Sequence, residues 1–350
     1  MNLVNIHSQD LSELLGIKFN VVKYRKLPQN LALSFPTFTP GTIQGELRSL
    51  FGNISPGELT SESQGYSCPP VKQLLDKPKI INTIHTWYKI SLYSLVHQSD
   101  EKLWTRGDSS TMKLYRVSKG SLLNSITTKS RSIPTDVAVT KKGHLVFIDP
   151  SDNTIYIVNN EKMEILIKFK KGKPRNICGT SSGDLLVVIS SYENKGGSKL
   201  VRYFGSKEKQ TIQFDGKGHP LYSSYSSDTT TKYVTENRNQ DICVADEGAK
   251  AVVVVNLAGK LRFRYIGHTL SSNSRSYIPR GITTDSQSHI LVADYHNHCV
   301  HILHQDGQFL CYLDCGLKYP YGLCVDTNDN LFVAQERNKQ VKKIKYMQEI

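Results

Sequence analysis

An internal repeat constrains the fold of this chain more than any other feature of its sequence. Three copies read PTDVAVTKKGHLVFIDPSDNTIYIV from residue 134, PRGITTDSQSHILVADYHNHCVHIL from residue 279 and PYGLCVDTNDNLFVAQERNKQVKKI from residue 320. Each copy opens on a proline, continues into an aliphatic stretch and a polar turn, and then repeats this alternation. Short β-branched stretches separated by Gly, Asn, Asp and Ser turns predict antiparallel strands joined by hairpins.

Six copies of the repeat follow one another along the chain. Their equivalent positions are Trp104, Asp149, Ile189, Asp246, Asp294 and Gln335. Successive positions lie 45, 40, 57, 48 and 41 residues apart, and the two longest intervals hold insertions at 222–232 and 268–277. Repeats of about 40–45 residues with four strands each are typical of β-propeller blades. The sequence therefore predicts an all-β, six-bladed propeller.

The last copy contains only three strands before the sequence ends. A blade with three strands leaves an open edge unless another segment pairs with it. The segment KIINTIHT, residues 79–86, has strand character and lies just before the first copy. We expect it to pair with residues 341–346 and to close the ring.

Composition limits the class of protein and its partners. With 38% hydrophobic and 21% charged residues the chain has the make-up of a globular domain, and no apolar run approaches the roughly 18 residues of a membrane span. The start lacks the pattern of a signal peptide, and seven scattered cysteines favour reduced thiols, so we expect a cytoplasmic protein without a membrane partner. A net charge of +13 favours acidic partners.

The copies at 279–303 and 320–344 resemble NHL repeats. Together with the segment FPTFTP…FGNISPGELTSESQGYS, the other copies are similar to the C-terminal half of invertebrate tripartite-motif (TRIM) NHL proteins. The resemblance implies a propeller that binds substrate proteins or RNA, preceded in that family by a RING, B-boxes and a coiled coil. The RING carries the ubiquitin-ligase activity of the family.

The sequence departs from that family at its N-terminal end. A RING or B-box needs seven or eight Cys and His ligands in paired spacing, whereas one cysteine, Cys68, and three histidines precede residue 134. We therefore expect no zinc module and no ligase activity in these 350 residues. Residues 1–76 are interpreted as an irregular linker, with a possible remnant of a coiled-coil end at 7–19, and residues 77–350 as the propeller.

The stretch from residue 295, YHNHCVHILH, raises the question of a metal site. The repeat aligns His296, His298 and His304 with polar turn residues of other copies and His301 with a third-strand position. His296 and His304 would lie roughly 20 Å apart at about 3.3 Å per residue. We therefore predict no metal site.

Catalysis is not favoured by the expected inner strands. Their residues are apolar or small, Cys178 and Cys324 among them, and offer no set of carboxylates for acid–base or metal chemistry. Asp285 and Asp326 recur in the repeat and are expected to bond turn amides. We predict a non-enzymatic chain without a cofactor.

One face of the propeller is expected to carry the binding site. The position after each opening proline lies near the channel mouth, and the turns between second and third strands lie on the same face. The predicted binding residues on this face are Arg106, Arg175, Lys250, Arg280, Tyr319, Tyr321, Arg337 and Lys339. Arginines beside exposed tyrosines suit an acidic surface of a protein substrate or adaptor. They also suit single-stranded RNA. A channel-sited hydrolase or lyase is the third hypothesis, and the oligomeric state is left open.

Overall fold

The computed structural model describes residues 72–190, 197–224, 231–268 and 275–349. It also describes the backbone of four short strands: β1 (Ala32–Leu33), β2 (Phe38–Thr39), β3 (Asn53–Ile54) and β4 (Leu59–Thr60). The chain divides into two units, residues 1–68 and 69–350. In the first unit β1 pairs with β4 and β2 with β3, both antiparallel. Of the expected linker 1–76, residues 72–76 belong to the strand Lys72–His85, and, apart from β1–β4, the remaining residues, the segment 7–19 among them, lie outside the described residues.

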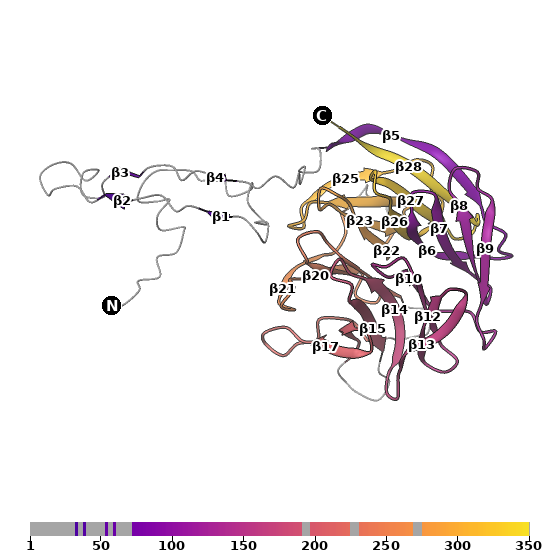
Figure 1. Ribbon diagram of the computed structural model, residues 1–350. Helices are drawn as coiled ribbons and strands as arrows, with labels where there is room; N and C mark the ends of the chain where they lie inside the picture. The colour runs from indigo at the N-terminus through magenta and orange to yellow at the C-terminus, as the bar shows by residue number, and fades with distance from the viewer. Residues whose placement is uncertain are drawn as a thin grey trace, which may run out of the picture. The chain divides into compact units, whose positions relative to one another are not determined.

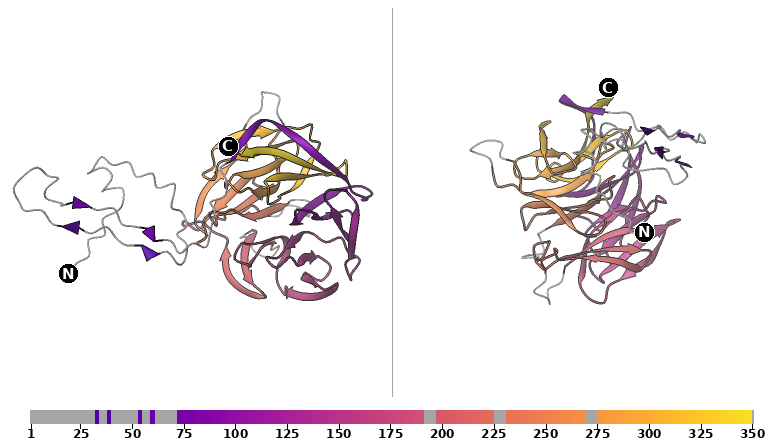
Figure 2. Two further views of the ribbon diagram at one scale, coloured as in Figure 1. Left: turned by 45° about the horizontal axis from the view of Figure 1, so that its top comes forward. Right: turned by 90° about the vertical axis from the view of Figure 1, so that its left-hand side faces the viewer.

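The second unit is a ring of six four-stranded antiparallel sheets, as the repeat predicted (Figures 1 and 2). Blade 1 consists of β6 (Leu92–Ser99), β7 (Lys102–Gly107), β8 (Thr111–Arg116) and β9 (Leu122–Thr127). Blade 2 consists of β10 (Val137–Val139), β11 (Leu145–Asp149), β12 (Thr154–Asn159) and β13 (Lys162–Lys168). Blade 3 consists of β14 (Lys173–Gly179), β15 (Leu185–Ser190), β16 (Lys199–Phe204) and β17 (Lys207–Ile212).

The remaining three blades follow the same plan. Blade 4 consists of β18 (Lys232–Glu236), β19 (Ile242–Asp246), β20 (Ala251–Val255) and β21 (Leu261–Tyr265). Blade 5 consists of β22 (Pro279–Thr284), β23 (Ile290–Asp294), β24 (Cys299–Leu303) and β25 (Phe309–Leu313). Blade 6 consists of β26 (Pro320–Val325), β27 (Asn330–Gln335), β28 (Gln340–Glu349) and β5 (Lys72–His85). The described residues form no helix, and so none that could span a membrane.

The closing strand pairs where the sequence predicted it to pair. β5 lies antiparallel to β28, with Ile84 opposite Val341 and Lys79 opposite Lys345 (Figure 1). The pairing extends beyond 79–86, because Leu74 also lies opposite Met347. The first segment of the ring thus supplies the fourth strand of the last blade.

The hydrophobic core lies between blades rather than within one layer. Each of its six clusters joins neighbouring blades; one contains Val252 of blade 4 and Ile290 of blade 5. The cluster that joins blade 6 to blade 1 includes Ile84, Phe332 and Leu103. Middle strands such as β19 and β20 are buried along their whole length because a neighbouring blade covers each face.

Aspartates close the first turn of the blades, as the repeat predicted. Asp285 accepts hydrogen bonds from the backbone N–H groups of Gln287 and His289, both at 2.9 Å. Asp326 accepts from those of Asn328 at 3.0 Å and Asn330 at 2.8 Å. These carboxylates satisfy turn amides and are part of the scaffold.

Closure of the ring by β5 gives the first prediction. Ile84 is 1% exposed between blades 6 and 1, whereas Ile81 on the same strand is 49% exposed. Ile84→Ala is expected to lower the free energy of unfolding by about 2–4 kcal/mol, because it leaves a cavity in the closing interface. Ile81→Ala is the matched control and should change it by less than about 0.5 kcal/mol. Urea denaturation of the full chain measures both, and equal effects would show that β5 does not close the core.

Candidate functional site

The first strands of the six blades surround a central channel. β6, β10, β14, β18, β22 and β26 contact one another in a ring. Two cavities lie along this channel, a mouth cavity of about 400 Å³ and a channel cavity of about 260 Å³. Tyr233 lines both of them.

The mouth cavity is lined by residues of all six blades, and five of the blades contribute charged or aromatic side chains. Its charged residues are Arg106, Arg175, Arg280 and Glu336, and its aromatic residues are Tyr93, Tyr233, Tyr295 and Tyr321. The four positions after the opening prolines, Thr135, Arg175, Arg280 and Tyr321, all line it. The expectation that the repeat places this position at the channel mouth is therefore confirmed.

Two glycines let the inner strands approach closely at this mouth. A side chain at Gly281 would collide with the backbone oxygen of Tyr321. One at Gly322 would come within 2.7 Å of the backbone oxygen of Tyr93. Because β22, β26 and β6 are so close, the side chains that flank these glycines are brought into contact.

Tyr321 is the centre of an aromatic cluster. The sequence predicted an exposed ring, but the ring is buried. Only 7% of its surface is accessible. Its ring makes edge contacts with those of Tyr93, Tyr233 and Tyr295 at centroid distances of 5.4, 6.0 and 5.9 Å. Burial raises the pKa of the Tyr321 hydroxyl, so this group stays protonated. The expectation of an exposed ring was wrong because neighbouring blades cover it.

Arg280 is held in place by the cluster and by a carboxylate. Its guanidinium lies 4.9 Å from the ring centroid of Tyr321 and 5.3 Å from that of Tyr295. Its Nη1 donates to Glu247, to the Thr231 hydroxyl at 3.1 Å and to the Tyr321 hydroxyl at 3.3 Å. Arg175 lies across the cavity and donates from Nε to the Ser190 hydroxyl at 3.1 Å.

The sequence predicted that Arg106 lies in a turn. It lies instead in strand β7, and 8% of its surface is exposed. The β7–β8 turn begins only after Gly107, so the arginine points into the mouth cavity instead of outward from the face. Its guanidinium lies 4.9 Å from the ring centroid of Tyr93. Three of the predicted arginines thus meet at one cavity.

The other four predicted residues lie outside the mouth cavity. Lys250 is exposed in the β19–β20 turn and donates to the Ser276 hydroxyl at 2.9 Å. Arg337 and Lys339 lie in the β27–β28 turn, and the Arg337 guanidinium stands 4.0 Å from the ring centroid of Tyr319. Tyr319 is half-buried and contacts Tyr295 at a centroid distance of 5.3 Å. These residues border the cavity without lining it, and their binding role stays a prediction.

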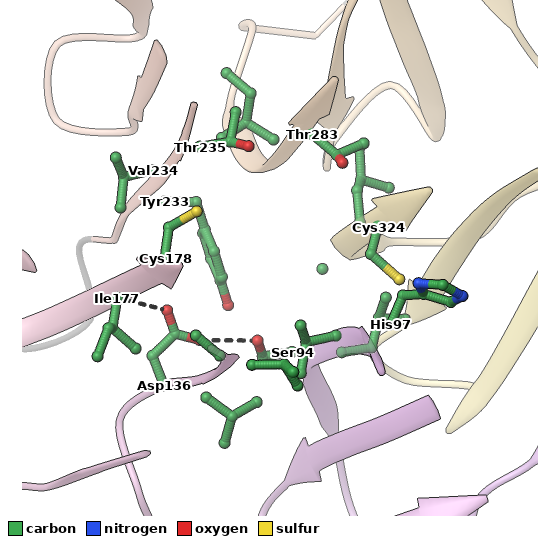
Figure 3. A pocket seen from close by; sticks show the side chains of 18 of the residues that line it. Ser94, His97, Asp136, Ile177, Cys178, Tyr233, Val234, Thr235, Thr283 and Cys324 are labelled. Atoms are coloured by element: carbon green, nitrogen blue, oxygen red, sulfur yellow. Dashed lines mark hydrogen bonds between the residues drawn. The ribbon is translucent and has the colours of Figure 1, made fainter. Parts of the chain in front are cut away.

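The channel cavity is more polar than the sequence indicated. Figure 3 shows Asp136, Ser94 and His97 around it, beside the predicted Cys178 and Cys324. Asp136 is buried and accepts hydrogen bonds from the Ser94 hydroxyl at 2.8 Å, the Ile177 N–H at 3.1 Å and the Asn176 amide at 3.2 Å. Asp136 and Asn176 each lie two residues after an opening proline. This shared polar position was the signal in the sequence that could have identified Asp136.

Burial shifts the pKa of each titratable group of this cavity toward its neutral form. Burial raises the pKa of the Cys178 thiol to about 12 and also raises that of Cys324. Burial raises the pKa of Asp136 despite its three donors. Burial lowers the pKa of His97, which lies 3.3 Å from Asp100. The arrangement offers one carboxylate and protonated thiols.

The histidine-rich stretch forms one cluster of side chains that could bind a metal ion. The sequence analysis did not predict this cluster. Asp294, Cys299 and His301 are all buried, and their potential ligand atoms lie within 4.8 Å of one another. The His301 Nδ1 is 2.8 Å from the Tyr265 hydroxyl, and its Nε2 is 3.3 Å from Asp294. Asp294 also accepts from the Asn297 amide at 2.7 Å.

Comparisons with known proteins agree with the fold. Residues 277–303 match the sequence profile of the NHL repeat. A comparison with curated protein sequences gives no significant match. The chain is similar in structure to a virginiamycin B lyase from Staphylococcus aureus (TM-score 0.55, 10% identity, 77% of this chain and 99% of that one). It is also similar to the WD40 β-propeller domain of Doa1 (TM-score 0.53, 11% identity, 77% and 98%).

A third similar structure is a protein of unknown function from Bacteroides thetaiotaomicron, with a TM-score of 0.58 and 13% identity over 83% of this chain and 79% of that one. At such identities the similarity establishes a shared propeller architecture. It transfers no activity, because propellers of one architecture host unrelated functions.

The state of the channel thiols gives the second prediction. Iodoacetamide reacts with the thiolate. Because the pKa of Cys178 is about 12 instead of the usual 9.0, the population of its thiolate is about 1000-fold lower. At pH 7.5 the native chain is therefore expected to leave Cys178 and Cys324 unmodified while glutathione in the same tube is consumed. In urea both cysteines should be alkylated, which mass spectrometry of their peptides will show. Alkylation of native Cys178 as fast as glutathione would reveal an activated nucleophile.

Proposed function

We propose that this chain is a non-catalytic binding module that recruits a protein partner through the mouth face of its propeller. The observation that carries the proposal is the convergence of Arg106, Arg175 and Arg280 with four tyrosines around one cavity. Arg and Tyr are the side chains that most often dominate protein interfaces. Propellers also place their variable residues on such faces, since the blades themselves are structural.

The proposed role is substrate recognition in a ubiquitin-ligase-like assembly of the TRIM-NHL type. The match of residues 277–303 to the NHL repeat supports this part of the proposal. The ligase activity would come from zinc-binding modules outside residues 1–350. A cytoplasmic location belongs to the same proposal and is supported by the six described cysteines, which are all free thiols.

Binding is favoured over catalysis by the state of the channel. A hydrolase or lyase of this architecture would need a general base or metal ligands at the reacting atoms. Here the carboxylate of Asp136 is occupied by three donors, and the nearby thiols are protonated. The lyases of similar fold share about a tenth of their residues with this chain, so their activity is not carried over to it.

A protein partner is favoured over single-stranded RNA by the packing of the tyrosines. Base stacking needs an accessible ring face. Tyr321, Tyr233 and Tyr295 are each 7–8% exposed, and Tyr233 and Tyr295 both contact Tyr321 edge to face. The pair of Arg337 and Tyr319 at the rim is the observation that supports RNA as the alternative.

Selection of peptides by the full chain tests the proposal. Peptides from a random display library should bind the wild-type chain. The mouth-face variant, Arg175→Glu with Arg337→Glu, should bind them at least about tenfold more weakly, because the new glutamates repel acidic groups of the peptides. The matched control is Lys141→Glu with Lys142→Glu, in the exposed β10–β11 turn at the other end of the channel. Isothermal titration of selected peptides gives the affinities. The proposal fails when repeated selection yields no binder, or when the peptides bind the mouth-face variant as well as the wild type.

The RNA alternative has a measurement of its own. Fluorescence anisotropy with a randomised single-stranded RNA pool is expected to show no saturable binding at 50 and 200 mM salt. RNA binding would instead fall by about 0.7 log unit per log unit of salt for each phosphate contacted. Such a slope, lost in the double mouth-face variant and kept in the control, would make RNA the ligand.

A further inference from the structure

Arg106 is a buried cation that forms no hydrogen bond within the described part of the chain. Only 8% of its surface is exposed. Its Nε is buried without a hydrogen-bond partner, and its guanidinium forms no ion pair with any described residue. The nearby carboxylate of Asp136 attracts the guanidinium electrostatically, but it accepts its hydrogen bonds from Ser94, Asn176 and Ile177. Burying a charged group whose hydrogen-bond donors are unsatisfied is unfavourable, so such a residue marks a place where a ligand supplies the missing acceptor.

We propose that the mouth cavity is a carboxylate-binding pocket in which Arg106 grips an acidic group of the partner protein. The ligand would be an aspartate or glutamate side chain or a C-terminal carboxylate. This inference rests on the proposed function and names the chemistry that the mouth face recognises.

The orientation of Arg106 suits a carboxylate. One face of its guanidinium is covered by the ring of Tyr93, with 4.9 Å to the ring centroid. Its N–H groups point along the edges of the plane, and these edges match the two oxygens of a carboxylate. The second predicted arginine, Arg175, lines the same cavity.

The carboxylates beside the arginines disfavour anions of higher charge. Glu247 accepts from Arg280, and Glu336, which accepts from Tyr295, lines the cavity. A carboxylate carries one negative charge, whereas a phosphate monoester at neutral pH carries nearly two. The two glutamates therefore disfavour phosphate more than they disfavour a carboxylate.

The cavity also has an apolar side for the rest of a side chain. Ile133, which is 45% exposed, and Pro134 lie on the loop before β10 and line it. An acidic side chain would place its methylene groups against these residues while its oxygens reach Arg106. A nucleobase would find no open ring there, because the tyrosine faces are covered.

Acetate and inorganic phosphate are the probes for the direct test. Each is titrated at pH 7 and constant ionic strength into the full chain labelled with ¹⁵N-arginine, and the Nε–Hε signals are followed by NMR. Acetate is expected to give a saturable shift of the Arg106 signal with a Kd on the order of millimolar, as fits a ligand of four heavy atoms. Phosphate should bind more weakly. Absence of a saturable acetate shift, or tighter binding of phosphate, would overturn the inference.

Three variants separate recognition from structure. Arg106→Lys keeps the charge without the planar fork and should weaken acetate about tenfold, as monitored on the Arg175 signal. Arg106→Gln should abolish the shift. Arg238→Gln, an exposed arginine of the β18–β19 turn, is the matched control and should leave it unchanged.

Thermal melting gives an independent readout. Arg106→Met removes a buried charge that has no hydrogen bond in the free chain, so the free chain should melt at least about 2 °C higher than the wild type. Acetate should raise the melting temperature of the wild type and not that of the variant. A variant that melts lower or does not fold would show that Arg106 stabilises the ring itself, against the proposal.

Peptides from the display selection distinguish failure of this inference from failure of the proposed function. An enrichment of Asp, Glu or free C-termini, and loss of binding when that group is amidated or Arg106 becomes Gln, supports both. Neutral peptides that still need the mouth face leave the proposed function standing and defeat the carboxylate pocket. Acidic peptides that bind the mouth-face variant undiminished defeat both.

Discussion

The structure depends on hydrophobic contact between neighbouring blades. No blade can bury its two faces alone, so each of the six core clusters is shared by neighbouring blades. The cluster between blades 6 and 1 can form only if β5 completes blade 6, and Ile84 lies in the middle of it. Ring closure therefore ties the first residues of the propeller to its last ones.

Closure also creates the mouth cavity. The inner strands come from positions up to 230 residues apart, for example Tyr93 on β6 and Tyr321 on β26, whose rings are 5.4 Å apart. The glycines at 281 and 322 permit this approach because the backbone of the next blade occupies the space of a Cβ atom. A binding site assembled in this way is rigid, since the same contacts that hold the ring hold its tyrosines.

The polar groups of the propeller fall into two kinds. The aspartates Asp285 and Asp326 recur in two blades, and each accepts hydrogen bonds from the backbone amides of its own turn. Asp136 and Arg106 have no such repeat, and they lie on the channel in adjoining cavities. Asp136 is satisfied by three donors, while Arg106 has no hydrogen bond within the described residues. This contrast is the physical basis for placing recognition at the mouth rather than in the channel.

The sequence by itself determined the number of blades, the antiparallel strands, the pairing of residues 79–86 with the last strand, and the lining of the mouth by the residues after the opening prolines. Each of these follows from a local pattern that recurs with a fixed spacing. Only the tertiary structure decided that Tyr321 is buried, that Arg106 points into the mouth cavity and that Asp136 lines the channel. Alternation along a strand says which face a side chain is on, but its exposure depends on how closely the next blade packs. That distance is set by residues far away in the chain, so no local pattern records it.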